Sequence, residues 1–284
     1  MSTSLEESYR LCCAIARRTA KNFYYSFLVM PQEKRRSMCA IYAFMRRSDD
    51  IADSAANPAV ALEGLRKWRA QVEAALNGGS SAEPILPALA DTVKRYRIEP
   101  RYFRELLDGA EMDQAVTRYE TFDDLYKYCY HVASVVGLIV LPVFGTTDES
   151  AKVPAEACGI AFQLTNILRD VKEDAQMGRV YLPREDLRKF GVEESDLMNG
   201  TATPQFLELM KFEAGRAHEF YQKAQPLLGM IDPDSRGTLA VMIGIYGGIL
   251  DKIENRNFAV FDGKIRLSAA EKSWIVIRNW VKYG

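Results

Sequence analysis

A stripe of oxygen-bearing side chains runs through the segment QLTNILRDVKED at residues 163–174. Its members are Gln163, Asn166, Asp170 and Asp174. Their spacings of three and four residues place them within about 80° of arc on an α-helix, beside an apolar arc. Carboxylates four residues apart repel each other and need compensation next to a core. Mg²⁺ supplies it, because this ion binds carboxylate and amide oxygens and leaves other positions for water or substrate phosphates.

A second acidic pair lies far upstream, where Asp49 and Asp53 are again four residues apart on a helical pattern. A solvated helix end explains this pair poorly, because acidic residues near a helix C-terminus oppose the helix dipole and the preceding turns are apolar on all sides. One such pair is common in helices. Two pairs that face each other would form a metal site for a diphosphate, and this is the site that the sequence predicts.

Such a site also needs cationic side chains, because a diphosphate carries more negative charge than metal ions alone usually offset. The candidates are Arg46, Arg169, Lys21, Lys264 and Arg266. Arg46 is the strongest, since it lies near an apolar helix surface and shares a face with Tyr42. For each of the others, a surface charge is the simpler interpretation.

The elements that must position these residues are helices, because apolar residues recur with a period near 3.6 and alternation with period two is rare. Helices are expected over residues 5–20, 32–54, 58–76, 84–96, 100–117, 122–144, 154–177, 204–228, 233–258 and 268–283, with short helices and loops over 184–203. The stretch 38–45 is apolar on all sides, which predicts a central helix. Because no linker is long or polar enough to separate two cores, residues 1–284 are predicted to form one all-α domain.

Aromatic side chains are concentrated in or near the helices that carry the acid pairs, which indicates a lipophilic cavity. They are Phe23, Tyr24, Tyr25, Phe27, Tyr42, Phe44, Tyr128, Tyr130 and Tyr246. For each of them taken separately, ordinary core packing is the simpler interpretation. Several glycines in the later helices permit either close helix contact or room for a chain, and the sequence does not distinguish these uses.

Composition argues against several other classes of protein. The formal net charge of −1 over 284 residues argues against a nucleic-acid partner. The five cysteines show no zinc-type spacing, so they are interpreted as reduced core thiols of a cytosolic protein. The N-terminus does not resemble a signal peptide, and the apolar run 132–144 is too short to span a bilayer. No GxGxxG, P-loop or HExxH motif supports a nucleotide cofactor or a zinc site.

Four segments resemble the signature blocks of the squalene and phytoene synthases, which are head-to-head prenyl synthases. These segments are DDIAD at 49–53, YCYHVASVVG at 128–137, QLTNILRDVKED at 163–174 and GRVYLP at 178–183. They occur in the order of the family, and the resemblance runs from about Tyr24 to the C-terminus. It implies the single-domain isoprenoid-synthase helical fold with a central cavity, and a prenyltransferase that uses two or three Mg²⁺ ions.

The resemblance also implies a role for each matching position. Asp49 and Asp53 would hold Mg²⁺ for one diphosphate, and Asp170 and Asp174 for the other, with Asn166 assisting. The residues that would bind phosphate oxygens are Arg46, Arg169, Lys21 and Lys264. Those that would lie along the cavity near the reacting chain are Phe23, Tyr42, Tyr130, Gln163 and Tyr246.

Three positions depart from the pattern of the family and leave alternatives open. The segment around Lys21 lacks the small hydroxyl residues that relatives often carry there. Lys264 occupies what resembles an arginine position, so Arg266 could take its role instead. The block at 128–137 contains two tyrosines, Tyr128 and Tyr130, and either one could face the substrate.

Within the family, the segments FYYSFLVMP, YCYHVASVVGL and AFQLTNILRDVKEDAQMGRVYLP look most like the bacterial presqualene diphosphate synthases of hopanoid synthesis. This implies condensation of two farnesyl diphosphates to presqualene diphosphate, which partner enzymes carry to squalene, with no need for NADPH. The alternatives are phytoene or dehydrosqualene synthesis, a complete NADPH-dependent squalene synthase and, remotely, a non-catalytic scaffold. We expect a cytoplasmic protein, with peripheral contact at the inner membrane face as a further option.

Overall fold

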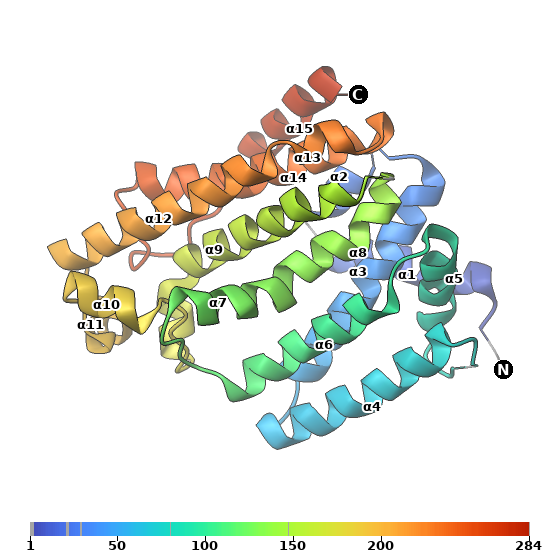
Figure 1. The fold of residues 1–284 in the computed structure, drawn as a ribbon, viewed down its shortest axis with the longest axis horizontal. Helices are drawn as coiled ribbons and strands as arrows, with labels where there is room; N and C mark the ends of the chain where they lie inside the picture. Colours follow the sequence, from blue (N-terminus) through green and yellow to red (C-terminus); the bar gives the residue numbers. More distant parts are fainter. Residues whose placement is uncertain (1–2, 21–22, 29, 80, 147, 284) are drawn as a thin grey trace.

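The computed structural model describes residues 3–20, 23–28, 30–79, 81–146 and 148–283. These residues form helices without a strand, and an isolated bridge joins Arg118 to Val180. The helices are α1 (Leu5–Thr19), α2 (Phe23–Phe27), α3 (Gln32–Asp53), α4 (Pro58–Leu76), α5 (Leu86–Tyr96), α6 (Pro100–Ala115), α7 (Phe122–Cys129), the π-helix η1 (Tyr130–Ser134), α8 (Val135–Phe144), the 3₁₀-helix η2 (Glu149–Ala151), α9 (Lys152–Gln176), α10 (Arg184–Phe190), α11 (Glu194–Asn199), α12 (Pro204–Ala224), α13 (Leu227–Met230), α14 (Pro233–Asn255) and α15 (Ala269–Tyr283). Figure 1 shows α4, α6, α9 and α12 with similarly inclined axes, and α15 at the outer edge.

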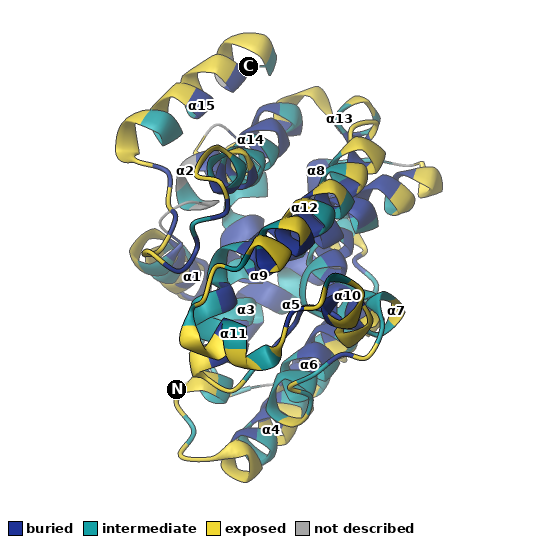
Figure 2. Ribbon diagram, turned by 90° about the vertical axis from the view of Figure 1, so that its left-hand side faces the viewer, coloured by how far each residue is buried: buried dark blue, intermediate teal, exposed yellow. Residues whose placement is uncertain are grey.

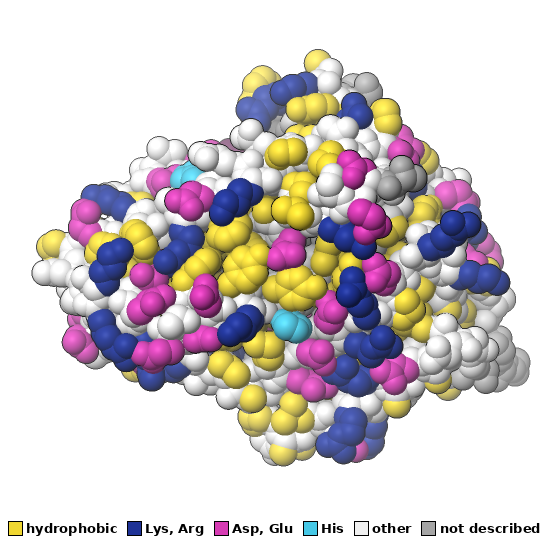
Figure 3. Space-filling model, viewed as in Figure 1, with side chains coloured by type: hydrophobic (Ala, Val, Ile, Leu, Met, Phe, Trp, Pro, Cys, Tyr) yellow, Lys and Arg dark blue, Asp and Glu magenta, His cyan; other side chains and the backbone are white. Residues whose placement is uncertain are grey.

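The predicted all-α fold is confirmed, and most helix ends agree with the sequence pattern. The segment 204–228 is divided into α12 and α13, and the charged segment 184–203 forms α10 and α11. Helix α14 ends earlier than expected, because Asn257 and Phe258 have φ values of 48° and 57°, which a right-handed helix does not adopt. All five cysteines carry free thiols, as expected. On the face seen in Figure 1, acidic and basic side chains are interspersed (Figure 3).

Helix α3 is one of two buried axes of the molecule. It packs against α1, α4, α5, α6 and α8, and its stretch 38–44 is buried except for Tyr42. The Phe44 ring lies 6.0 Å from that of Trp68 on α4 and 5.2 Å from that of Phe103 on α6. Burial of a side chain such as Phe44 contributes roughly 1.5–3 kcal/mol. The central position predicted for this helix is therefore confirmed.

Helix α9 is the second axis. It packs against α7, η1, α8, α12 and α14, and it buries an apolar stripe that includes Ile160, Leu164, Ile167 and Val171. Figure 2 shows α9 in the middle of the fold, with the exposed residues of α12 on the outside. Since both acid pairs are carried by core helices, the backbone of each pair is held by the packing of the whole domain.

The predicted helix 122–144 is continuous, but its turn Tyr130–Ser134 is π-helical. Helix α9 meets this turn backbone to backbone: a Cβ atom at Gly159 would stand 2.4 Å from Ser134 Cα and 2.5 Å from Ser134 N. The Ser134 hydroxyl also donates a hydrogen bond of 2.8 Å to the Glu156 carbonyl. The absence of a side chain at Gly159 therefore permits the close contact that sets the distance between these helices.

Among the described residues, Phe122–Phe144 is the one helix that is long and apolar enough to cross a membrane by length and composition. The apolar run 132–144 noted in the sequence is only the second half of this helix. Within the fold, 56% of the most apolar window of this helix is buried, and α8 packs against α3, α6 and α9. The core of the domain therefore accounts for its apolar character.

After α14, residues 256–268 form a C-terminal strap that crosses toward α9. The Lys172 ammonium on α9 donates a hydrogen bond of 2.6 Å to the Phe261 carbonyl of the strap. The Phe261 ring lies 4.7 Å from that of Phe206 on α12. Helix α15 then packs on α14. The strap is therefore fixed at two points close to the second acid pair.

We expect Gly159→Ala to lower the free energy of unfolding by roughly 1–3 kcal/mol, because its methyl group would overlap backbone atoms that cannot move independently. Gly215→Ala on α12 is the matched control, since no atom lies within 4 Å of a Cβ there. The control should raise stability by up to about 1 kcal/mol through helix propensity. Urea unfolding measures both, and equal stabilisation by the two substitutions would contradict the close contact.

Candidate active site

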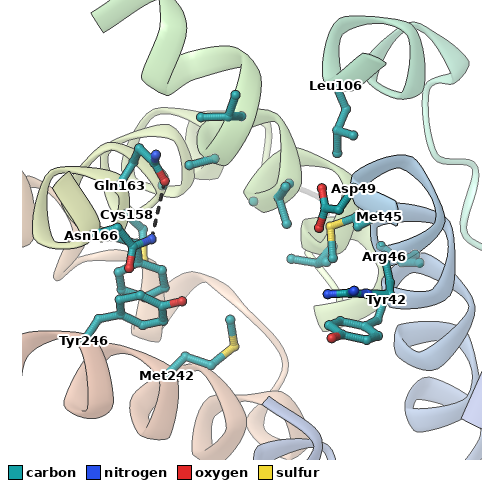
Figure 4. A pocket seen from close by; sticks show the side chains of 18 of the residues that line it. Tyr42, Met45, Arg46, Asp49, Leu106, Cys158, Gln163, Asn166, Met242 and Tyr246 are labelled. Atoms are coloured by element: carbon teal, nitrogen blue, oxygen red, sulfur yellow. Dashed lines mark hydrogen bonds between the residues drawn. The ribbon is translucent and has the colours of Figure 1, made fainter. Parts of the chain in front are cut away.

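A cavity of about 420 Å³ lies between α3 and α9, closed by residues of α2, α6, η1, α8, α13 and α14. Its walls are polar at one end, where Asp49, Asp53 and Asn166 stand, and apolar toward the N-terminal half of α3. Figure 4 shows Tyr42, Arg46 and Asp49 of α3 facing Gln163 and Asn166 of α9 across this space. The cavity therefore combines a polar end with an apolar interior, as the sequence predicted.

The first acid pair occupies the last two turns of α3. Asp49 is open to the cavity yet closely surrounded by protein, and this burial together with the charge of Asp53 raises its pKa to about 6. Arg46 forms an ion pair with Asp50, but its Nε atom is buried and has no hydrogen-bond partner. The first pair thus combines incompletely compensated negative charge with a buried donor whose N–H is unused.

The second acid pair, Asp170 and Asp174, lies on α9. It belongs to the same stripe as Gln163 and Asn166, which line the cavity, but it lies beyond the part of the helix that lines the cavity. Burial disfavours the charged form of Asp170, but hydrogen bonds from Arg169 (2.9 Å) and Lys264 (2.9 Å) outweigh it and lower its pKa. Burial, and then repulsion by Asp170, raise the pKa of Asp174 to about 7. The two carboxylates therefore differ, since Asp170 is compensated by cations and Asp174 is not.

These donors fit hard divalent cations. In the described ranges, no group of three or more histidine, cysteine or acidic side chains could hold a metal ion by itself. Each acid pair therefore offers a metal ion two carboxylates and no third protein ligand of these types. Mg²⁺ is commonly held by one or two carboxylates together with waters and substrate phosphates. The raised pKa values of Asp49 and Asp174 indicate negative charges that no cation fully compensates. The Arg46 Nε is a donor without a partner. A metal diphosphate would satisfy both the charges and the donor.

Several other predicted residues lie at this site. Tyr42, Gln163 and Tyr246 line the cavity, and the Tyr246 ring stacks on that of Phe162 at 4.3 Å. The predicted residue Lys264 contacts Asp170. Arg266 is exposed on the strap and does not line the cavity.

Two of the predicted positions fall at the edge of what the structure describes. Lys21 lies outside the described residues. Phe23 begins α2, and its side chain is also outside the described part.

Among the described residues, neither Tyr128 nor Tyr130 is part of the cavity lining, so the expectation that Tyr130 lies along the cavity stays a prediction. The Tyr130 hydroxyl donates a hydrogen bond of 3.0 Å to Glu105. Residues two apart on a helix point in nearly opposite directions, so only one tyrosine of this block can face inward. That residue is Tyr128, which is buried beside Tyr119 and Tyr181, with ring distances of 5.3 and 5.2 Å.

Two charged residues of the cavity lining were not predicted, namely Asp113 at the end of α6 and Arg179 in the turn after α9. Arg179 belongs to the GRVYLP segment, which the sequence presented as a helix-stopping turn. Its position directly after the second acid pair was the available signal. Asp113 has no motif around it, and its partners are Arg179 and Tyr181 of the segment after α9 and Tyr128 of α7.

Comparisons with known proteins agree with this arrangement. A family described as squalene/phytoene synthase matches residues 16–271. The chain is 40% identical over 269 residues to a phytoene synthase of Arthrospira platensis, covering 90% of this chain and 87% of the relative. It is 38% identical over 270 residues to the 15-cis-phytoene synthase of Synechococcus elongatus, with coverage of 91% and 87%.

Solved structures give the same result for the fold. The crystal structure of a dehydrosqualene synthase in complex with a ligand matches with a TM-score of 0.90 at 34% identity, covering 98% of this chain and 97% of that one. The squalene synthase HpnC from Alicyclobacillus acidocaldarius matches with a TM-score of 0.84 at 27% identity, with coverage of 89% and 95%.

We expect Asp174→Asn to stabilise the metal-free protein at pH 8 by roughly 1 kcal/mol, allowing for screening of a partly accessible group. The folded-state pKa of about 7 lies above the unfolded value of about 3.9, so the wild-type protein gains stability as the pH falls from 8 toward 4. The variant should lack this gain. Thermal unfolding with a chelator at several pH values measures both effects.

Asp170→Asn is the matched control, because its carboxylate is held by Arg169 and Lys264 and its pKa is lowered. This variant should lose stability at pH 8, since two cations would lose their partner. A loss of stability for Asp174→Asn as large as that for Asp170→Asn would refute the difference between the two carboxylates.

Proposed function

The chain belongs to the squalene/phytoene synthase family of prenyltransferases, and from this premise we propose that it is a Mg²⁺-dependent phytoene synthase. Its substrate would be geranylgeranyl diphosphate, two molecules of which are joined head to head. The observation that carries the proposal is the 40% identity over 90% of the chain to a phytoene synthase. Further relatives at 35–38% identity also bear the name phytoene synthase.

This proposal replaces the first interpretation of the sequence, in which farnesyl diphosphate gives presqualene diphosphate for downstream squalene-forming enzymes. The squalene synthase HpnC is a more distant match, at 27% identity. The similarity to a dehydrosqualene synthase, at 34% identity and a TM-score of 0.90, keeps that enzyme class as the second candidate. The two candidates differ in the length of the prenyl chains and share the polar end of the site.

The apolar part of the cavity supports a long prenyl substrate. Its lining extends along α3 from Asp53 to Met38, and the fifteen helical steps between these residues span about 22 Å. Phe144 closes the same end as Met38, since its carbonyl accepts a hydrogen bond of 3.3 Å from Lys34 near the start of α3. We therefore assign Met38 to the floor of the cavity, where its side chain would set how much chain fits above it.

The first chemical step would be cleavage of the C1–O bond of one substrate, with the electron pair leaving on diphosphate. Bound Mg²⁺ would supply Lewis-acid stabilisation of that charge. Arg46 would add its unused Nε donor on the α3 side. Arg169 and Lys264 would keep Asp170 ionised on the α9 side. The stacked rings of Phe162 and Tyr246 present aromatic faces, which attract a cation and exclude water from it.

The double bond of the second substrate would then attack the allylic cation, and loss of a proton would close a cyclopropyl diphosphate. Departure of the second diphosphate, rearrangement of the carbon skeleton and loss of another proton would give the hydrocarbon. Carbon is neither oxidised nor reduced by an external reagent in this sequence, so no NADPH would be consumed. This agrees with a sequence that carries no glycine-rich dinucleotide motif.

We expect the purified enzyme with Mg²⁺ to convert geranylgeranyl diphosphate to a forty-carbon hydrocarbon, with or without NADPH. Mass spectrometry of parallel reactions with farnesyl and geranylgeranyl diphosphate provides the test. A thirty-carbon diphosphate as the main product would restore the first interpretation, and squalene formed only with NADPH would identify a complete squalene synthase. No product from a folded, Mg²⁺-binding enzyme would indicate a scaffold.

We expect Met38→Trp to shift the substrate preference toward farnesyl diphosphate by at least tenfold in kcat/KM, because the larger side chain shortens the cavity. Met38→Leu is the matched control, since it nearly conserves volume and should keep the wild-type preference. Competition between the two substrates measures the ratio directly. An unchanged ratio for a folded Met38→Trp variant would show that Met38 is not the floor.

A further inference from the structure

A cluster of polar side chains outside the predicted site lies at the polar end of the cavity. Asp113, near the end of α6, is held by two residues of the segment that follows α9. The Tyr181 hydroxyl donates a hydrogen bond of 3.0 Å to the Asp113 carboxylate. The Arg179 guanidinium donates one of 3.0 Å from Nη2 to the Asp113 carbonyl. Two segments far apart in the sequence are thereby joined at the wall of the cavity.

The backbone around Arg179 is fixed from the outer side. The Arg179 N–H bonds to the Asp174 carbonyl at 2.8 Å, and the neighbouring Val180 N–H bonds to the Thr117 carbonyl at 3.0 Å. From outside, Arg118 donates a hydrogen bond of 2.6 Å to the Gly178 carbonyl and pairs with Glu194 at 2.7 Å. Because its backbone is held at these points, the direction of the Arg179 side chain is defined.

Arg179 stands between the two acid pairs. It lines the main cavity together with Asp49 and Asp53, and it also lines a small adjoining recess together with Asp174. Within the described ranges, Arg46 and Arg179 are the cationic side chains of the main cavity lining. Arg46 is paired on the α3 side, so Arg179 is the cation that borders both pairs.

The guanidinium of Arg179 has more N–H donors than its hydrogen bond to Asp113 uses. An arginine side chain carries five N–H donors in a planar fork that matches phosphate oxygens. The hydrogen bond to the Asp113 carbonyl uses one of them. The charges of Asp113 and Asp174 both attract the guanidinium, although it forms a direct ion pair with neither within the described part of the chain.

We propose that Arg179 is a diphosphate-binding residue that stabilises the leaving group between the two acid pairs, and that Asp113 and Tyr181 position it. This rests on the proposed function only in that the substrate is a prenyl diphosphate of any length. Without ligand, the nearby carboxylates hold the guanidinium over the cavity. When the C1–O bond breaks and its electron pair moves to the diphosphate, the free N–H donors bind the oxygens that gain charge.

The surroundings of Asp113 favour this positioning role. Tyr119, Tyr128 and Tyr181 form a stack of buried rings beside it, with centroid distances of 5.2–6.0 Å. An attraction between charges is stronger against such a wall than in water. The stack also contains an internal control, because the buried Tyr119 hydroxyl has no hydrogen-bond partner, whereas the Tyr181 hydroxyl binds Asp113.

The test uses inorganic diphosphate with Mg²⁺ as the probe, bound to the full-length enzyme and followed by calorimetry without turnover. We expect Arg179→Gln to weaken diphosphate binding at least tenfold, and Arg179→Lys to recover part of it through its charge. Arg188→Gln on α10 is the control, because Arg188 is exposed and pairs with Glu120 rather than with residues 178–181, and it should change binding less than twofold. Equal binding by wild type and Arg179→Gln, or an equal loss in Arg188→Gln, would overturn the proposal.

The positioning role has its own pair of variants. Tyr181→Phe keeps the ring stack and removes the Tyr181 hydrogen bond to Asp113. We therefore expect diphosphate binding to be about threefold weaker, and we expect kcat to fall by a larger factor than KM changes. Tyr119→Phe removes a hydroxyl without a partner and should change neither. Equal effects of the two substitutions would refute the role of Tyr181. Product identity is read separately, so a thirty-carbon product would refute phytoene synthesis and leave this result intact.

Discussion

The structure depends on placing two pairs of like-charged carboxylates on core helices, the first pair in the cavity lining and the second beyond that lining on α9. Burial raises the pKa of Asp49 and of Asp174, so each pair opposes folding to some extent while no ligand is bound. The apolar stripes of α3 and α9 must supply the stability that the acids remove. This explains why the acid pairs stand on the two most deeply packed helices, where the surrounding core overrides the repulsion.

The sequence predicted the fold and both acid pairs because each is a local pattern. Helical period, paired acids at a spacing of four and the oxygen-bearing stripe on α9 are all visible within a few turns. Asp113 could not be predicted in this way, since its partner Tyr181 is 68 residues away. The choice between Tyr128 and Tyr130 stayed open for a related reason, because it depends on how α7 and η1 pack against their neighbours.

The cavity has two ends of different character, and each bears on a different aspect of function. Its polar end, with Asp49 on one side and Asn166 on the other, is the part to which we assign diphosphate departure. Its apolar end, around Met38 and Phe144, is the part that we propose to limit the length of the prenyl chain. The sequence carried strong motifs for the first part and only scattered apolar residues for the second. The type of reaction was therefore predictable from the sequence, whereas the proposed substrate rests on the relatives.

The C-terminal strap has a consequence for synthesis of the enzyme in the cell. Lys264 compensates Asp170, yet it enters the chain 94 residues later, after α10 to α14 have been made. Since domains emerge from the ribosome with the N-terminus first, α9 is synthesised long before Lys264, which is translated almost last. A nascent chain can thus form its helices early, but Asp170 gains its second cationic partner only near the end of translation.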